Sequence, residues 1–377
     1  MKRLSVFLGS IALAAVLVTG IAGCGDSSSE TLNPAILLLA GSSKQTPYII
    51  TGNTTDGFTA AKKGVTLKPE NQPIQNVINA IQSHAEGEAC DIQFGDGSEL
   101  AIGTNYMDFD GGVTGDDWGK ITLSGKITSS YATATQGTIY LQRGVSVTSK
   151  ADIANTASSN GRAIYNDGSG TVTIFGGTVQ TTGGYAICNN SIGKVSISGG
   201  TVSAAGSNAV RNENGGEVII SGGTVQATGS GITIRSDNGG TVTITGGTVQ
   251  SSGYIIRNYN GSTVTISGGT LYSSAGTTAV DNSSGTVNIS GGTISTISAD
   301  VVGNSSGGVV TISNGTLQTA SGNAVYNMAG STVTISGGKV EATEAFGYAI
   351  YNEAGGTVTV YSSATITGNT SGSITYL

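Results

Sequence analysis

Charged residues are scarce in this sequence: only 10% of the 377 residues are Asp, Glu, Lys or Arg, and the formal net charge is −7. Proteins that bind nucleic acid usually carry a basic patch, so this balance argues against a nucleic-acid partner. Few charges together with 61 glycines would also suit a disordered chain. A strict alternation of apolar and polar residues through most of the sequence excludes that interpretation, because it buries Val and Ile in register.

Catalytic signatures are also lacking. The single histidine, His84, lies outside the repeats described below, and no H-E-x-x-H or phosphate-binding loop is present. The sequence therefore favours a non-catalytic protein.

Cysteine occurs only three times. Lys2 and Arg3 precede a short apolar run over 4–18, and the segment ends in Ile-Ala-Gly-Cys24. A basic start, a short apolar stretch and small residues before a cleavage site are typical of an export signal. The last four residues resemble the lipobox of bacterial lipoproteins, which implies that Cys24 becomes the lipidated N-terminus. We therefore expect a signal peptide over 1–23, a flexible tether over 24–31, and a lipid anchor in the bacterial envelope, at the outer membrane or cell surface.

The other two cysteines, Cys90 and Cys188, fall about four repeats apart. Stacked strands are separated by about 4.8 Å, and a disulfide needs Cα atoms within about 7 Å. We expect two free thiols and a fold held by its apolar core.

The sequence is dominated by a repeat. Between Gly170 and Leu377 the pattern T-V-T-I-x-G-G-T-V, followed by A-I-x-N, recurs about every 23 residues. A fixed period of this length predicts a solenoid. Each repeat holds three strand-like pieces, in which residues such as Val172, Val179 and Ile187 point inward.

Three strands and about 23 residues per coil resemble the parallel β-helices of pectin-lyase-like proteins, and this resemblance implies a right-handed coil. The Gly-Gly-Thr-Val repeats also resemble those of bacterial surface proteins over 73–377. We predict an all-β parallel β-helix of about twelve coils over 93–377.

One helix is expected before the repeats. Ile74, Val77, Ile78 and Ile81 follow Pro73 at the spacing of one helical face. Because open strand edges promote aggregation, we expect this helix to cover the N-terminal end of the solenoid, within a capping region over 32–92. Residues 373–377 show no similar pattern, which leaves open end-to-end self-association at the C-terminal coil.

An asparagine occupies the same repeat position in eight coils, and Ser236 interrupts this column. Stacked Asn side chains can hydrogen-bond along a solenoid axis, and Asn suits tight turns. We interpret the column as structural. Its members are Asn166, Asn189, Asn212, Asn258, Asn282, Asn304, Asn327 and Asn352.

Three arginines directly precede the asparagine position in consecutive coils: Arg211, Arg235 and Arg257. They would stand about 5 Å apart, and like charges on neighbouring strands destabilise a sheet. Nearby Glu213 and Asp237, solvent, or a bound polyanion must offset this repulsion.

Arginine suits bidentate capture of carboxylates, and Tyr254 and Tyr259 lie near the third arginine in the sequence. One hypothesis is a groove for an acidic glycan, such as a uronic acid polymer, with these tyrosines as a stacking surface. The alternative is a set of local ion pairs on a solvated face.

A second candidate site is an acidic, glycine-rich loop before Trp118, containing Asp108, Asp110, Asp116 and Asp117. Carboxylate oxygens are the ligands that Ca²⁺ prefers, although the spacing does not match an EF-hand. Calcium is thus the only cofactor that the sequence suggests. The alternative is an acidic loop that binds no metal.

A third feature is a set of Thr-x-Thr pairs at 171/173, 241/243, 263/265, 332/334 and 357/359. They resemble the flat ice-binding face of some β-helical antifreeze proteins. Lys194, Glu217, Ile219 and Val309 interrupt the array, and the preference of Thr for strands accounts for most of it.

Pectin-lyase-like relatives include polysaccharide hydrolases, which need a carboxylate pair, and lyases, which this resemblance associates with Ca²⁺-bound Asp residues and an Arg or Lys base. Arg235 with Asp237 and Glu213 is the nearest combination in this sequence. Since fold does not imply function, we predict a surface-anchored, non-catalytic lipoprotein that binds carbohydrate, with acidic glycans favoured. The alternatives are a polysaccharide lyase, a purely structural envelope scaffold, and an ice-binding protein.

Overall fold

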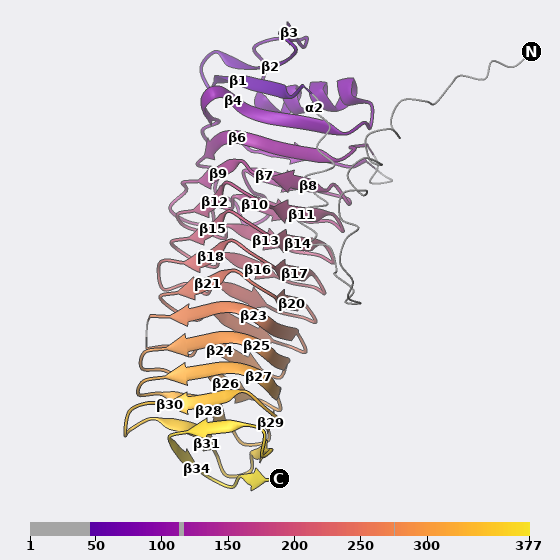
Figure 1. Ribbon diagram of the computed structural model, residues 1–377. Helices are drawn as coiled ribbons and strands as arrows, with labels where there is room; N and C mark the ends of the chain where they lie inside the picture. The colour runs from indigo at the N-terminus through magenta and orange to yellow at the C-terminus, as the bar shows by residue number, and fades with distance from the viewer. Residues whose placement is uncertain (1–45, 113–116, 275) are drawn as a thin grey trace, which may run out of the picture. The chain divides into compact units, whose positions relative to one another are not determined.

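The computed structural model describes residues 46–112, 117–274 and 276–377, so the predicted signal peptide, tether and Cys24 lie outside the described residues. The described residues form a parallel β-solenoid of about 12 coils with a spacing of about 23 residues, which confirms the predicted fold class (Figure 1).

Each coil has three faces. A 12-stranded parallel sheet forms one of them. Its strands are β5 (Met107–Phe109), β7 (Ile139–Leu141), β10 (Ile164–Asn166), β13 (Ile187–Asn189), β16 (Val210–Asn212), β19 (Ile234–Ser236), β22 (Ile256–Tyr259), β24 (Val280–Ser283), β26 (Val302–Ser305), β28 (Asn323–Asn327), β31 (Tyr348–Asn352) and β34 (Asn369–Ser371).

A 23-stranded sheet forms the other two faces and bends between them. The T-V-T-I pieces give β8 (Val147–Ser149), β11 (Thr171–Ile174), β14 (Lys194–Ile197), β17 (Glu217–Ile220), β20 (Thr241–Ile244), β29 (Thr332–Ile335), β32 (Thr357–Val360) and β35 (Thr375–Tyr376). The G-T-V pieces give β9 (Asp152–Asn155), β12 (Thr178–Thr181), β15 (Thr201–Ala204), β18 (Thr224–Ala227), β21 (Thr248–Ser251), β30 (Lys339–Ala342) and β33 (Thr365–Thr367). Five longer strands run over both faces: β4 (Cys90–Ala101), β6 (Ile121–Ser129), β23 (Thr263–Ser273), β25 (Thr286–Thr296) and β27 (Val309–Thr319).

The alternating pattern of the repeat places its β-branched residues in the core. In β11, Val172 and Ile174 are fully buried while the two threonines face outward. Val172 pairs in register with Val195 of β14, and Ile174 with Ile197. Stiff, branched side chains stack well on a pleated surface, so identical columns build one continuous apolar core along the solenoid.

Two glycines occupy the bend between the two faces of the 23-stranded sheet, one because of its backbone conformation and the other because a neighbouring coil lies close to it. Gly223 has φ +72°, a left-handed conformation that side chains other than glycine rarely adopt. A Cβ on Gly222 would collide with the carbonyl of Ser198 in the preceding coil. The repeated Gly-Gly pair is therefore required by the turn and by the close approach of neighbouring coils.

The N-terminal end is covered by more than the predicted helix. Helix α2 (Ile74–Ala85) begins directly after Pro73, and its predicted apolar face is buried in the core. The sequence analysis missed an antiparallel hairpin of β1 (Tyr48–Asn53) and β2 (Gly57–Lys62), to which the short β3 (Val65–Thr66) is added. Strand β1 also pairs in parallel with β4, which begins slightly before the expected boundary at residue 93.

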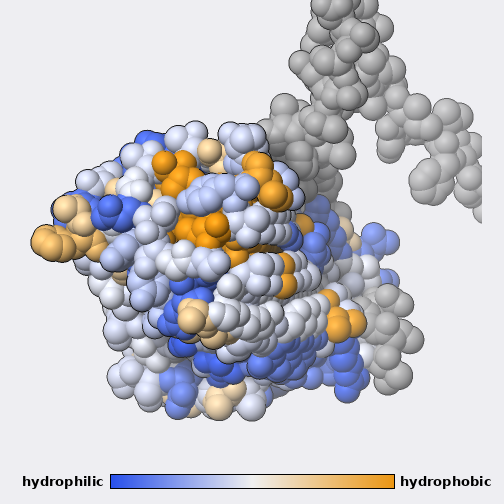
Figure 2. Space-filling view, turned by 90° about the horizontal axis from the view of Figure 1, so that it is seen from below, coloured by the Kyte–Doolittle hydropathy of each residue, from blue (hydrophilic) through white to orange (hydrophobic). Residues whose placement is uncertain are grey.

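Cys90 and Cys188 are buried free thiols, as predicted. Nowhere in the described ranges is a helix both long and apolar enough to cross a membrane. Seen from below, apolar residues gather at the C-terminal coil, where Ala364, Ile366 and Ile374 pack against the core but are only partly buried (Figure 2). Self-association there stays a prediction.

Candidate functional site

The asparagine column lies inside the solenoid, where it links successive coils. In six pairs of neighbouring coils, the side-chain nitrogen Nδ2 of one Asn donates to Oδ1 of the Asn in the next coil at 2.8–2.9 Å, and Ser236 interrupts this ladder. The same nitrogen also donates to a carbonyl in the following turn, as Asn189 does to Gly193. Because these side chains are almost fully buried, the column holds the turns in place and offers no surface to a ligand.

The residues on either side of each buried asparagine face outward on the 12-stranded sheet. Arg211, Arg235 and Arg257 stand in register on β16, β19 and β22. The structure therefore brings the three predicted arginines into one row, with Asp281 of β24 next in line.

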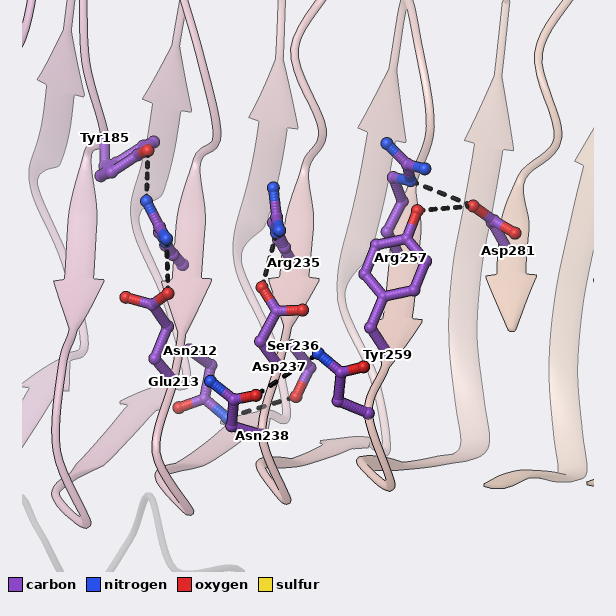
Figure 3. A network of polar contacts seen from close by, with 12 residues as sticks. Tyr185, Asn212, Glu213, Arg235, Ser236, Asp237, Asn238, Arg257, Tyr259 and Asp281 are labelled. Carbon is purple, nitrogen blue, oxygen red and sulfur yellow. Dashed lines mark hydrogen bonds and ion pairs between the residues drawn. The ribbon is translucent and has the colours of Figure 1, made fainter. Parts of the chain in front are cut away.

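Each arginine of this row has a carboxylate partner (Figure 3). Arg211 bonds to Glu213, which is two residues further along the chain. Arg235 Nε donates to Asp237 Oδ2 at 2.6 Å, and Arg257 Nε donates to Asp281 Oδ2 at 3.0 Å. The protein's own acids thus offset the repulsion between the stacked guanidinium groups.

The three arginines differ in what remains available to a ligand. Arg211 uses both terminal nitrogens, since Nη1 donates to the Tyr185 hydroxyl at 2.5 Å and Nη2 to Glu213. Arg235 and Arg257 donate through Nε alone, so among the described residues their Nη groups have no hydrogen-bond partner. The exposed fraction of these two side chains is 37% and 32%, against 26% for Arg211.

Tyrosine rings flank the two available guanidinium groups. The Arg257 guanidinium lies 4.7 Å from the ring centres of both Tyr254 and Tyr259, and that of Arg235 lies 5.7 Å from Tyr259. The Tyr259 hydroxyl donates to Asp281 at 2.9 Å, which fixes the ring between two coils. Cation–π contacts of this kind orient a guanidinium at a partly exposed site.

Tyr185 belongs to the same surface, and the sequence analysis missed it. Its ring lies 5.1 Å from the Arg211 guanidinium. The repeat contains the signal that could have identified it, because Tyr185 and Tyr254 both stand four residues before an asparagine of the column. We call Tyr185, Arg211, Arg235, Tyr254, Arg257 and Tyr259 the arginine stretch.

A buried cluster of side chains borders the arginine stretch on its N-terminal side. Tyr140, Tyr165 and Cys188 pack together and are almost inaccessible. The Arg162 guanidinium lies 5.3 Å from the ring centre of Tyr165 and 5.0 Å from that of Tyr185. Burial raises the pKa of the Cys188 thiol to about 11 and also raises the pKa of Tyr165. These groups are structural, so the accessible surface begins at Tyr185.

The acidic loop does not form a cluster around one point in the described residues. Gln142 Nε2 donates to both Asp108 oxygens, at 2.8 and 2.9 Å, and burial raises the pKa of this carboxyl. Asp110 accepts from the Gly112 amide and lies 3.5 Å from Arg143 Nε. Asp116 lies outside the described residues; within them, no three His, Cys, Asp or Glu side chains, Asp117 included, are grouped to hold a metal ion.

The threonine pairs stack as a grid only in part. Thr241 and Thr243 of β20 face Thr263 and Thr265 of β23 in register, but the ion pair of Lys194 with Glu217, at 3.1 Å, interrupts the same face. The neighbouring face holds a longer column that the sequence analysis did not single out. It consists of Thr178, Thr201, Thr224, Thr248, Thr270, Thr293 and Thr316.

Comparison with known proteins gives no relative: no protein-family model matches the chain, and no match was found among curated proteins or solved structures.

Proposed function

We propose that this protein is an exported, lipid-anchored β-solenoid that binds an acidic glycan on the arginine stretch without cleaving it. The lipobox-like sequence ending at Cys24 supports export and attachment to the envelope. The resemblance to pectin-lyase-like β-helices supports an acidic polysaccharide as the ligand class.

One observation carries the proposal. Arg235 and Arg257 stand side by side, and their Nη groups have no partner among the described residues, while Nε of each is held by an aspartate of the protein. A guanidinium that is fixed in this way loses little further freedom on binding, and its terminal nitrogens match the geometry of a carboxylate. Tyr254 and Tyr259 supply apolar ring surface beside the same nitrogens.

The test uses soluble protein that starts after Cys24 and an oligogalacturonate hexasaccharide as the probe, with titration calorimetry at low and high salt. Arg235→Gln and Arg257→Gln should each weaken binding by about tenfold or more, because each removes a charge-assisted contact. Arg211→Gln serves for comparison and should weaken binding less, since both terminal nitrogens of Arg211 already bond to Tyr185 and Glu213. Equal losses in all three variants, or no binding by the unmodified protein, would contradict the proposal. Unsaturated sugar products would instead indicate a lyase.

A further inference from the structure

A second group of aromatic side chains lies on the same sheet, towards its C-terminal end. Tyr326 of β28 and Tyr351 of β31 stand in register, with ring centres 5.4 Å apart. Tyr348 meets Tyr351 edge to face, also at 5.4 Å. All three are only partly buried, unlike Tyr140 and Tyr165. We call these three residues the tyrosine platform.

The charges around the tyrosine platform are acidic, which distinguishes it from the arginine stretch. The Tyr326 hydroxyl donates to Glu353, and this bond, together with partial burial, raises the pKa of Tyr326 to about 12. The negative charge of Asp300 also raises the pKa of Tyr326. Asp300 Oδ1 accepts two hydrogen bonds from Asn323 of β28. Among the described residues, no arginine or lysine makes a cation–π contact with the three rings or an ion pair with Glu353.

Several groups of the platform are available to a ligand. Of the three platform hydroxyls, only that of Tyr326 has a hydrogen-bond partner within the described residues. Phe346, two residues before Tyr348, is 90% exposed.

We propose that the tyrosine platform is a second carbohydrate subsite, which takes an uncharged pyranose. The face of an aromatic ring is electron-rich, and the C–H groups on one side of a pyranose carry partial positive charge, so the two surfaces attract. The tyrosine hydroxyls can exchange hydrogen bonds with sugar hydroxyls. Glu353 and Asp300 would repel a carboxylate, which excludes the uronic acid proposed for the arginine stretch.

The two subsites lie on one line along the solenoid. Three strand spacings, or about 14 Å, separate Arg257 on β22 from Tyr326 on β28. A polymer that contains both acidic and neutral sugars could therefore contact both. Contact of one polymer with both subsites rests on the proposed function, whereas the neutral subsite is supported by the contacts of Tyr326, Tyr348 and Tyr351 themselves.

The test measures binding of two probes, the neutral glucan cellohexaose and the oligogalacturonate hexasaccharide, by titration calorimetry. The double variant Tyr348→Ala, Tyr351→Ala should lose about tenfold or more in affinity for cellohexaose and keep its affinity for the acidic probe. The pair Tyr348→Phe, Tyr351→Phe retains the rings and should lose less. Tyr272→Ala, a single exposed tyrosine on β23, is the control and should change neither affinity.

Each possible outcome either supports or overturns the proposed neutral subsite. Absence of cellohexaose binding in the unmodified protein, or unchanged binding in the alanine variant, would overturn it. If the alanine variant does not fold, as judged by circular dichroism, the phenylalanine pair decides, because it must weaken the binding of the neutral probe if the hydroxyls contact it. Binding of cellohexaose alone would support the tyrosine platform and refute the acidic-glycan proposal.

Discussion

Replacing Ser236 by asparagine should stabilise the solenoid by completing the amide ladder. Asn212 Nδ2 reaches Ser236 Oγ only at 3.5 Å, and the buried Oδ1 of Asn258 has no hydrogen-bond partner in the part of the chain that the structure describes. The amide introduced by Ser236→Asn would accept from Asn212 and donate to Asn258, as the other pairs do at 2.8–2.9 Å. Two gaps in the ladder would thus be repaired by one substitution.

The expected magnitude follows from these two contacts. A net hydrogen bond contributes about 1 kcal/mol, and a buried polar atom without a partner costs about 1–3 kcal/mol. Ordering a longer side chain subtracts part of this gain, so we expect Ser236→Asn to raise the free energy of unfolding by about 1–3 kcal/mol. Ser262 in the next coil should not obstruct the new side chain, because Asn304 makes its ladder bond next to the equivalent Ser331.

The assay is urea denaturation followed by circular dichroism, with the slope m compared between variants to check that unfolding stays cooperative. Asn304→Ser is the matched reverse change, since it creates the same gap elsewhere in the ladder, and it should lower stability by a similar amount. The reasoning fails if Ser236→Asn is neutral or destabilising while Asn304→Ser is destabilising, because the gap at Ser236 would then be stabilised by some other feature of its coil.

Three further substitutions and measurements test the rest of the structure. Gly223→Ala should destabilise the protein by several kcal/mol more than Gly307→Ala, because both have a left-handed φ but only the first Cβ would lie within 2.7 Å of a neighbouring carbonyl, as thermal or urea denaturation would reveal. Ile78→Ala should cost about 2–5 kcal/mol, since this helix residue is fully buried in the core, whereas the exposed Asn79→Ala should have little effect on the same denaturation curve. Burial raises the pKa of both Cys90 and Cys188 from 9.0 to about 11, so on the order of 0.1% of each is thiolate at pH 8. Labelling by a thiol reagent should therefore be slow at pH 8 and accelerate as the pH approaches 11. Rapid labelling of native protein at pH 8, assigned to Cys188 by peptide mapping, would show that this coil opens readily.

Within the repeats, the sequence was sufficient to predict the fold because each constraint acts over a few residues and recurs. The alternation in Thr171–Ile174 decides which side chains point inward, and the Gly-Gly pair decides where the chain bends. A strand cannot shift by one residue without exposing its whole apolar set, so the columns of Val and Ile also determined the register between coils. The hairpin β1–β2 was missed because it occurs once, without a repeat to reinforce its pattern.

The candidate sites depended on contacts that repeat positions alone do not determine. The sequence placed Arg211, Arg235 and Arg257 in one row, but as three equivalent residues. Only the tertiary structure shows that they differ in the nitrogens left available to a ligand. The hydroxyl of Tyr185 from the preceding coil accepts a hydrogen bond from Nη1 of Arg211, whereas Asp281 from the following coil bonds to Arg257 through Nε. The buried state of Tyr165 and the partial exposure of Tyr351, at the same repeat position, likewise result from neighbouring loops and coils. Local periodicity fixes which way a side chain points, whereas its hydrogen-bond partners and its access to a ligand depend on residues that meet it only when the coils stack.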